Sequence, residues 1–389
     1  MHLSKLYLKN FRNYKSLQLH IEPGIILIQG SNGEGKSNLL EAIYILSIAK
    51  SYRTRNEKDL IYKYKENDID FTQIEAKTLH NQIESEIQIN YHISKPIESI
   101  KNKIESKTNF TKSIRLNGVN INSSTLVGNL TAVLFNAEDL DIISGSPSVR
   151  RKYIDIFISQ LNKKYLIALQ NYQKILIQRN NLLKIIRKGK ANKEELYFWN
   201  NELIRSGTYL VEERNSTINL LNKLSLPIHK DLSDNQEDLN ITYLPNISDI
   251  TQENTVIKSF EEQLIIREKD EILQGITLVG PHRDDINISI NKMNAHSYAS
   301  RGQSRTAILS MKLAQAKVLM DFYKKEPIIL LDDVLSELDI HRSKKILDIA
   351  TKYTQCIITT SDENLLNNPN ILSNQKFKIQ ENNIFSTLK

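Results

Sequence analysis

The stretch Gly30-Ser31-Asn32-Gly33-Glu34-Gly35-Lys36-Ser37 decides the fold of this chain of 389 residues. It matches the phosphate-binding pattern G-x-x-x-x-G-K-[ST] at every fixed position. An apolar run of strand length, residues 25–28, precedes it. Apolar residues then recur at helical spacing: Leu39, Leu40, Ile43 and Leu46. Strand, glycine-rich turn and helix are the context that this pattern needs, so the sequence predicts a nucleoside triphosphate site.

The residue types of this loop suit phosphate chemistry. Glycines let consecutive backbone N–H groups turn inward toward phosphate oxygens, and the positive end of the following helix adds to that attraction. Lys36 is expected to reach the β- and γ-phosphates, and the hydroxyl of Ser37 to ligate Mg²⁺. The alternative is an ordinary glycine turn before a core helix, which the complete pattern disfavours.

A second motif, which is acidic, lies near the other end of the chain. Four apolar residues, 328–331, are followed by Asp332 and Asp333. A buried parallel strand that ends in a carboxylate suits a magnesium ion beside a phosphate loop, so we expect Asp332 to hold the ion and Asp333 to orient the attacking water. Read alone, the pair could be a surface acid at the end of a core strand. Since 332 − 36 = 296, the site must be assembled from both chain ends.

Helical patterns fill the middle of the chain. Apolar residues spaced four and three apart from Ile154 to Ile186 predict one long helix, and a second helix follows a turn at 188–192 until Pro227 stops it. The two helices are expected to pack as an antiparallel hairpin. Residues 239–243 and 276–279 read as strands, and residues 253–274 as a further helix.

These patterns predict an α/β fold in which an ATPase-type head with mixed sheets carries an inserted helical arm. We expect the N-terminal part of the head at 1–148, the arm at 149–275 and the C-terminal part at 276–389. The chain has 52 Lys and Arg against 45 Asp and Glu, a net charge of +7. This excess suits a polyanionic partner such as nucleic acid, but equally a solvated, lysine-rich surface.

The composition argues against disulfide-rich, metal-stabilised and membrane-spanning classes of protein. A single cysteine, Cys356, rules out an internal disulfide framework and agrees with a reducing compartment. Scattered histidines give no structural metal pattern. No apolar run is long enough for a membrane helix, so we expect a soluble, cytoplasmic protein without a membrane partner.

Three further groups of residues are candidates for binding. Arg12 lies in a polar turn close to the nucleotide strand, or is a plain hairpin connection. The cluster Ser300-Arg301-Gly302-Gln303 opens a helix, as an anion-binding terminus or as an ordinary cap. The candidate DNA contacts are basic residues that could equally be solvated: Arg53, Arg55, Arg150 and Arg151.

Taken together, the motifs resemble the ABC-type ATPases of the SMC class, and in detail the RecF family of bacterial DNA replication and repair proteins. The resemblance runs nearly end to end. Its residues are Asn10–Tyr14, Gly30–Ala42, Ser51–Thr54, Gly145–Asp155, Gly280–Asp285, Ser300–Gln303 and Leu330–Asp339.

The resemblance implies that ATP and Mg²⁺ are bound between two copies of the chain. Arg12 would lie near the base or the α-phosphate, Lys36 and Asp333 would act in catalysis, and the cluster 300–303 would be a signature motif that completes the partner's site. It further implies an ATP-dependent homodimer that clamps DNA at single-/double-strand junctions and binds single-stranded DNA. With RecO and RecR, such a clamp would promote recombinase loading and SOS induction.

The chain departs from the wider class at two positions. Asp333 stands where a glutamate is usual, which implies weak, DNA-stimulated and slow hydrolysis. The position of the transporters' switch histidine reads Thr359-Thr360-Ser361. Two alternatives remain: a clamp that binds ATP without significant hydrolysis, or another ABC-type ATPase such as a transporter subunit.

Overall fold

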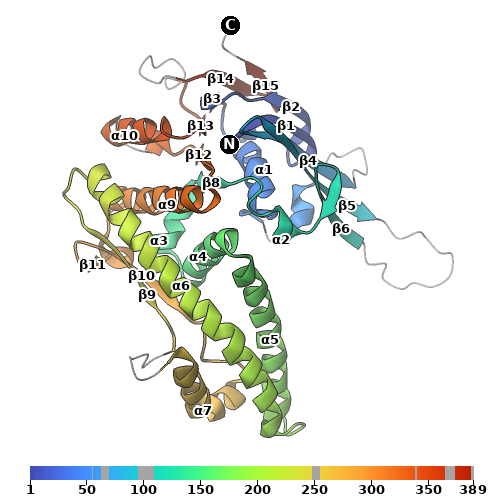
Figure 1. Cartoon of the computed structure of the whole chain (residues 1–389), viewed down its shortest axis with the longest axis vertical. Helices are drawn as coiled ribbons and strands as arrows, with labels where there is room; N and C mark the ends of the chain where they lie inside the picture. The colour runs from blue at the N-terminus through green and yellow to red at the C-terminus, as the bar shows by residue number, and fades with distance from the viewer. Residues whose placement is uncertain are drawn as a thin grey trace, which may run out of the picture. The chain divides into compact units, whose positions relative to one another are not determined.

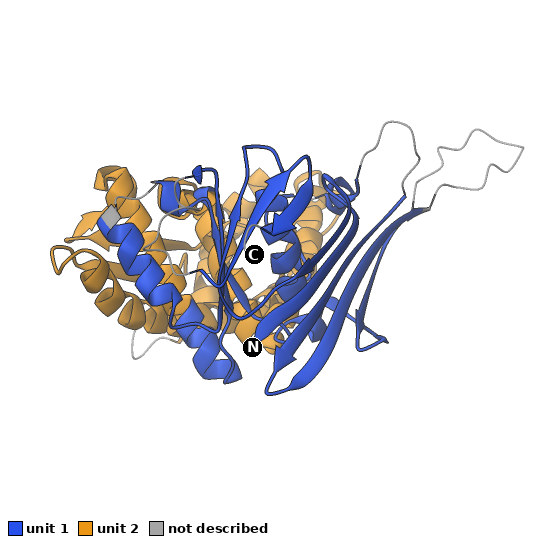
Figure 2. Cartoon of the chain, turned by 90° about the horizontal axis from the view of Figure 1, so that it is seen from above, with its two compact units in different colours: residues 1–137, 316–389 blue, residues 138–315 orange. Residues whose placement is uncertain are grey.

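The computed structural model describes residues 1–54, 56–62, 70–94, 109–247, 255–337, 340–363 and 373–386. The chain forms two compact units, residues 1–137 with 316–389, and residues 138–315 (Figures 1 and 2). The expected boundaries at 148/149 and 275/276 stay a prediction about domains. The compact units divide the chain elsewhere, so residues 300–303 belong to the second unit. Within the described ranges, no helix is both long and apolar enough to cross a membrane.

A mixed sheet at the centre of the first unit joins the two ends of the chain (Figure 1). Its strand order is β15-β14-β3-β13-β12-β8, and all neighbours are parallel except β14 and β15. The bounds are β3 Gly24–Gln29, β8 Ala132–Phe135, β12 Ile328–Asp332, β13 Gln355–Thr360, β14 Gln375–Gln380 and β15 Asn383–Ser386. The N-terminal strand β3 lies between two C-terminal strands, which confirms the expected assembly from both ends.

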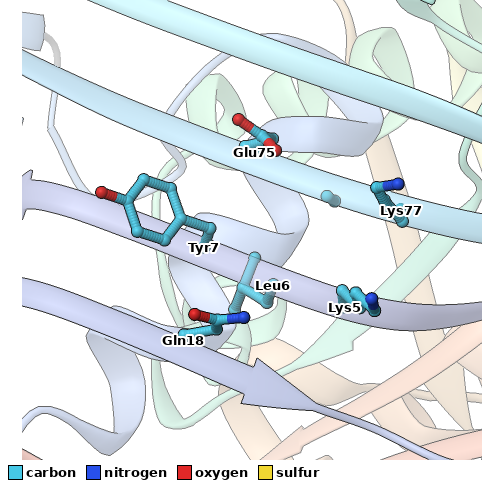
Figure 3. Close-up of a pocket in the computed structure, with 7 residues that line it drawn as sticks. Lys5, Leu6, Tyr7, Gln18, Glu75 and Lys77 are labelled. Atoms are coloured by element: carbon cyan, nitrogen blue, oxygen red, sulfur yellow. The ribbon is translucent and has the colours of Figure 1, made fainter.

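A second, antiparallel sheet of the first unit has the order β2-β1-β4-β5-β6-β7. Its strands are β1 His2–Phe11, β2 Tyr14–His20, β4 Phe71–His80, β5 Ile83–Ser94, β6 Asn109–Leu116 and β7 Val119–Ile121. Burial alternates along β1 and β4, because one face packs on a core shared with helix α1, Lys36–Ile48. The polar face of β1, β2 and β4 carries a hollow of about 340 Å³ around Tyr7 (Figure 3). No residue lining this hollow belongs to the phosphate loop.

The first unit also contains α2, Ser123–Leu126, and α10, Ile340–Ala350. The second unit is mainly helical and includes a three-stranded sheet of order β11-β10-β9 (Figure 1). Its elements are α3 Asp141–Ser144, α4 Pro147–Leu161, α5 Lys163–Arg187, α6 Leu196–Leu232, β9 Leu239–Leu244, α7 Val256–Gln274, β10 Asp285–Ile290, β11 Met293–Asn294 and α8 Ala295–Tyr298. Helix α9, Arg301–Tyr323, begins in this unit and ends in the first.

Three local predictions were wrong. The expected single helix breaks at Asn162, whose side chain accepts hydrogen bonds from the amides of Lys164 and Tyr165 and so starts α5 anew. Helix α6 continues through Pro227, because the buried residues on both sides of the proline keep packing. Residues 276–279 form no strand: the amides of Thr277 and Leu278 donate instead to side chains of α5 and α7.

Candidate nucleotide site

The phosphate loop connects β3 to α1, as the sequence predicted. Gly33 and Gly35 adopt left-handed backbone angles, φ 89° and 103°. A Cβ at Gly35 would lie 2.8 Å from the hydroxyl of Tyr14, so only glycine fits there. That hydroxyl donates to the carbonyl of Gly35 over 3.0 Å, which ties the loop to the adjacent strand β2.

The charged residues of the loop brace it from within. The ammonium group of Lys36 donates to the carbonyls of Gly30, at 2.6 Å, and Ser31, at 3.0 Å. The carboxylate of Glu34 accepts the amide of Ser31 over 2.7 Å. These contacts hold the loop backbone by hydrogen bonds within the loop itself.

The two distant motifs meet at Ser37 and Asp332. The hydroxyl of Ser37 donates to Oδ1 of Asp332 over 3.0 Å, and the hydroxyl of Thr359 donates to the same oxygen over 2.8 Å. Burial raises the pKa of Asp332, and the two hydroxyl hydrogen bonds act in the opposite direction. Hydroxyl and carboxylate oxygens are the ligands that Mg²⁺ takes beside phosphates, so this pair fits the expected ion.

Asp333 follows in a left-handed conformation, φ 54°, which aspartate tolerates better than most residues. Its amide donates to the carbonyl of Thr359 over 3.2 Å, and its carboxylate accepts from the hydroxyl of Ser336 over 2.8 Å and from the amide of Ser361 over 3.3 Å. The carboxylate is therefore held at the ends of β12 and β13. Its catalytic role stays a prediction.

Sequence reasoning missed the contribution of Thr359 and Ser361. Both lie at the end of β13, which pairs with β12 so that Asp332 faces Thr359. The signal was present, since residues 356–358 are apolar and polar residues follow at 359–361. The rule that ligands gather at the carboxyl ends of parallel strands could have found them.

A buried carboxylate organises the arginines beside α1. Glu41, in α1, is fully buried, and its carboxylate accepts hydrogen bonds from Nε and Nη2 of Arg12, at 2.9 and 2.7 Å. Arg53 donates to the side chain of Asn38 over 2.6 Å and lies 3.6 Å from Glu41. Arg53, a predicted DNA contact, therefore borders the phosphate-loop helix, next to Arg12. Arg55 lies outside the described residues.

The signature candidate lies in the second unit at the start of α9. The amide of Ser300 donates to Oε1 of Gln303 over 2.9 Å, and the amide of Gln303 donates to the hydroxyl of Ser300 over 3.2 Å. This reciprocal pair is a capping box, which leaves Arg301 and Gly302 between its two members. A role of the segment in a partner's site stays a prediction.

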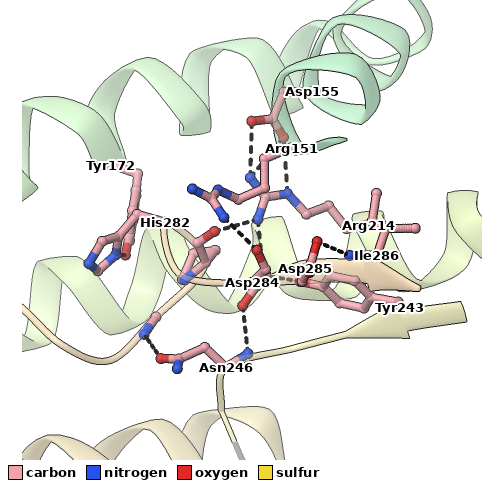
Figure 4. A network of polar contacts seen from close by, with 12 residues as sticks. Arg151, Asp155, Tyr172, Arg214, Tyr243, Asn246, His282, Asp284, Asp285 and Ile286 are labelled. Carbon is pink, nitrogen blue, oxygen red and sulfur yellow. Dashed lines mark hydrogen bonds and ion pairs between the residues drawn. The ribbon is translucent and has the colours of Figure 1, made fainter. Parts of the chain in front are cut away.

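Arg150 and Arg151, the other predicted DNA contacts, have partners inside the second unit. Arg150 binds Asp285 through Nε and Nη2, at 2.7 and 3.0 Å. Arg151 donates to the carbonyl of Asp284 over 2.6 Å (Figure 4). The side chain of Arg150 is only 10% exposed. These contacts hold α4 against β10, so the geometry does not favour the predicted DNA role of this pair.

A buried polar network continues from this point (Figure 4). Arg214 of α6 forms ion pairs with Asp155, at 2.8 Å, and Asp284, at 3.0 Å, and Asp284 also accepts from the hydroxyl of Tyr243. His282 lies within hydrogen-bond distance of Tyr172, and burial lowers its pKa to about 4. The stretch 280–285 thus joins α4, α5 and α6, which is a structural role.

The β3–loop–α1 geometry, the acid at the end of β12 and the sheet order define an ABC-type ATPase head of the SMC class. The RecF/RecN/SMC N-terminal domain model matches residues 2–384. Solved structures support the class: an Smc head bound to the C-winged helix domain of ScpA shares the fold, with a TM-score of 0.53 at 15% identity.

Within this class the chain belongs to the RecF family. It is 36% identical over 369 residues to the DNA replication and repair protein RecF of Lachnoclostridium phytofermentans, covering 95% of both chains. It is 38% identical over 366 residues to RecF of Bacillus thuringiensis, covering 93% of this chain and 92% of that one. A structure of the recombination mediator protein RecF with ATP, in the RecFOR pathway, matches over 100% of this chain and 98% of that chain, with a TM-score of 0.86 and 30% identity.

Proposed function

We propose that this protein is an ATP-controlled DNA-binding protein of recombinational repair and replication restart, acting in the cytoplasm. The observation that carries the proposal is the 3.0 Å contact between Ser37 and Asp332, which assembles a phosphate loop and a magnesium ligand from opposite chain ends. The similarity to RecF proteins over nearly the whole chain, including one solved with ATP, supports the nucleotide and the pathway.

In this proposal ATP is bound by the loop amides of residues 30–37, with Lys36 at the β- and γ-phosphates and Arg12 nearer the base or α-phosphate. Ser37 and Asp332 would hold Mg²⁺, which neutralises phosphate charge when it is bound. Asp333 orients the water for slow hydrolysis, and its contacts with Ser336 and Ser361 fix its carboxylate for that task.

The ATP-bound form is proposed to be a homodimer in which residues 300–303 of one copy meet the γ-phosphate held by the other. Nucleotide then adds contacts to the interface and shifts monomer toward dimer by linkage. Hydrolysis removes the bridging phosphate and releases the clamp. RecO and RecR are the proposed protein partners, since the matched structure names a mediator of the RecFOR pathway. Recombinase loading and SOS induction would follow from the assembled complex.

Helix α5 is the proposed DNA-contacting element. The sequence contains no acidic residue between Asp155 and Glu194. The lysines on the solvent side of α5 and just after it are exposed, and in the described part of the chain they form no ion pair: Lys163, Lys174, Lys184 and Lys188. Unpaired lysines along one face of a helix of about 37 Å suit contacts with phosphates, hence weak sequence specificity and strong salt dependence.

The test is sedimentation of the protein with a slowly hydrolysed ATP analogue, with and without a junction of single- and double-stranded DNA. We expect a dimer only with nucleotide, and tighter DNA binding in that state. Ser300→Arg should prevent the dimer while leaving nucleotide affinity intact, and Lys36→Arg should weaken nucleotide and DNA retention together. A nucleotide-dependent dimer that persists in Ser300→Arg would contradict the proposed signature contact.

Phosphate release measured on the same samples separates the alternatives. Slow release that DNA accelerates supports an ATPase clamp. Release at background level with intact dimerisation would show that ATP serves only as a structural ligand.

A further inference from the structure

The side-chain amide of Gln303 is fixed at both of its ends. Its Oε1 accepts the amide of Ser300 over 2.9 Å, and its Nε2 donates to Oε1 of Glu237 over 3.0 Å. Because the donor and acceptor ends have different partners, a rotation of the amide by 180° would break both hydrogen bonds. Glu237 therefore determines the orientation of a residue within the signature candidate.

Glu237 also lies beside a residue at the end of α6. It lies in the connection between α6 and β9, and its side chain is 13% exposed. Its Oε2 lies 3.2 Å from Nε2 of His229, a fully buried residue in the last turn of α6. One carboxylate thus contacts both the end of α6 and the start of α9.

The other nitrogen of His229 contacts α9 directly. Nδ1 lies 3.2 Å from the hydroxyl of Ser310, which donates its own proton to the carbonyl of Thr306 over 2.7 Å. Nδ1 is therefore the donor in this contact, and Nε2 faces the carboxylate of Glu237. The histidine and Glu237 together anchor the first three turns of α9 to α6.

We propose that Glu237 is a positioning residue for the signature segment, which it orients through Gln303 for contact with the nucleotide of the partner subunit. This inference rests on the proposed function, in which residues 300–303 complete the partner's site. Truncation of Glu237 frees the amide of Gln303 and loosens the helix start, so the ATP-bound dimer becomes weaker while the nucleotide affinity of the monomer is unchanged.

The experiment is a double-mutant cycle read by the dissociation constant of the dimer with the slowly hydrolysed ATP analogue. We expect Glu237→Ala to raise this constant about tenfold, which is the effect of removing one hydrogen bond to a charged group. Gln303→Ala should have a similar effect, and the double variant should be no worse than either, because both remove the same interaction. Glu237→Gln keeps an acceptor for Gln303 and should restore most of the affinity.

Asp238→Ala is the matched control, because Asp238 is the neighbouring acid but pairs with Lys230 at the surface. It should leave the dimer unchanged. If the wild type does not dimerise with nucleotide, the proposed function fails. If the wild type dimerises and the Glu237 and Gln303 substitutions act additively or not at all, the positioning role is overturned. If Glu237→Ala does not fold, Gln303→Glu gives the test: it places a second carboxylate against Glu237 and should weaken the dimer, and adding Glu237→Gln to the same chain should restore the hydrogen bond and the dimer.

Discussion

At the scale of one residue, Asp332 is a proposed binding group whose charge lowers the stability of the folded state. Its carboxylate is partly buried, and that burial raises its pKa, which means that the charged form is held less favourably in the folded state than in water. The hydroxyls of Ser37 and Thr359 compensate only in part. In the proposed function, the charge of Asp332 serves to bind Mg²⁺.

We therefore expect Asp332→Asn to separate stability from function. Without nucleotide the variant should melt at the same temperature as the wild type or about 1–3 °C higher, because a buried charge is removed. With Mg²⁺ and ATP, we expect the melting temperature of the wild type to rise and that of the variant not to, because the ion loses its proposed anionic ligand. Scanning calorimetry with and without Mg-ATP measures both. A variant less stable than the wild type without nucleotide would contradict this account.

The second prediction at the scale of one residue concerns His282 and the pH dependence of stability. Burial lowers its pKa from 6.5 to about 4, so the folded state holds it neutral where the unfolded chain would protonate it. Above pH 6.5 this histidine therefore does not lower the free energy of unfolding. As the pH falls from 6.5 toward 4, it lowers that free energy progressively. At pH 5.5 the loss is about 1.4 kcal/mol of unfolding free energy relative to pH 7.5.

Urea denaturation of the wild type and of His282→Gln at both pH values measures this loss. When the pH is lowered from 7.5 to 5.5, the unfolding free energy of the wild type should fall by about 1.4 kcal/mol more than that of the variant. An equal pH response of the two proteins would show that another group carries the effect.

At the scale of elements, the sequence predicted what local patterns determine. The phosphate loop, β3, α1 and the acidic end of β12 could be read because their residues are adjacent in the chain. The polar residues 359–361 after an apolar run indicated that β13 contributes to the site, but which of them lies beside Asp332 depends on strand register, which no local pattern specifies. The break at Asn162 was missed because the apolar spacing keeps its phase from α4 into α5, although the cap residue itself was visible.

The prediction at the scale of elements concerns DNA binding by helix α5. Changing Lys163, Lys174 and Lys184 to glutamine should weaken duplex binding and reduce the steepness of its salt dependence by about 1 to 3 in the log–log slope, about one for each phosphate that is no longer neutralised. Fluorescence anisotropy over a range of salt concentrations measures both. The same number of exposed lysines on α6 and α7, changed in the variant K223Q/K258Q/K269Q, is the control and should leave the slope unchanged. If both triple variants behave alike, net charge rather than α5 determines binding.

At the scale of the whole chain, one side chain shows how the first unit is closed. Gln355, at the start of β13, is fully buried; it accepts the amide of Leu3 over 2.8 Å and donates to the carbonyls of Leu3, at 2.9 Å, and Glu22, at 3.0 Å. This residue thus joins the C-terminal part of the chain to its first strand.

Gln355→Leu should lower the unfolding free energy of the first unit by about 2–4 kcal/mol, because it leaves the amide and carbonyl of Leu3 buried without the partner that Gln355 supplies. Gln380→Leu, at an exposed position of β14, should change it by less than about 0.5 kcal/mol. Urea denaturation followed by far-UV circular dichroism compares the two. Similar stability of both variants would mean that water reaches the freed groups of β1.

The position of β3 between β13 and β14 has a consequence for biosynthesis. Both neighbours of this strand, which begin at Gln355 and Gln375, are synthesised long after it, so the nascent chain carries an apolar strand and its glycine loop without lateral partners until they emerge. A nascent chain that ends before β12 lacks Asp332, so the proposed pocket for Mg²⁺ and triphosphate can arise only after residues 328–360 have been synthesised.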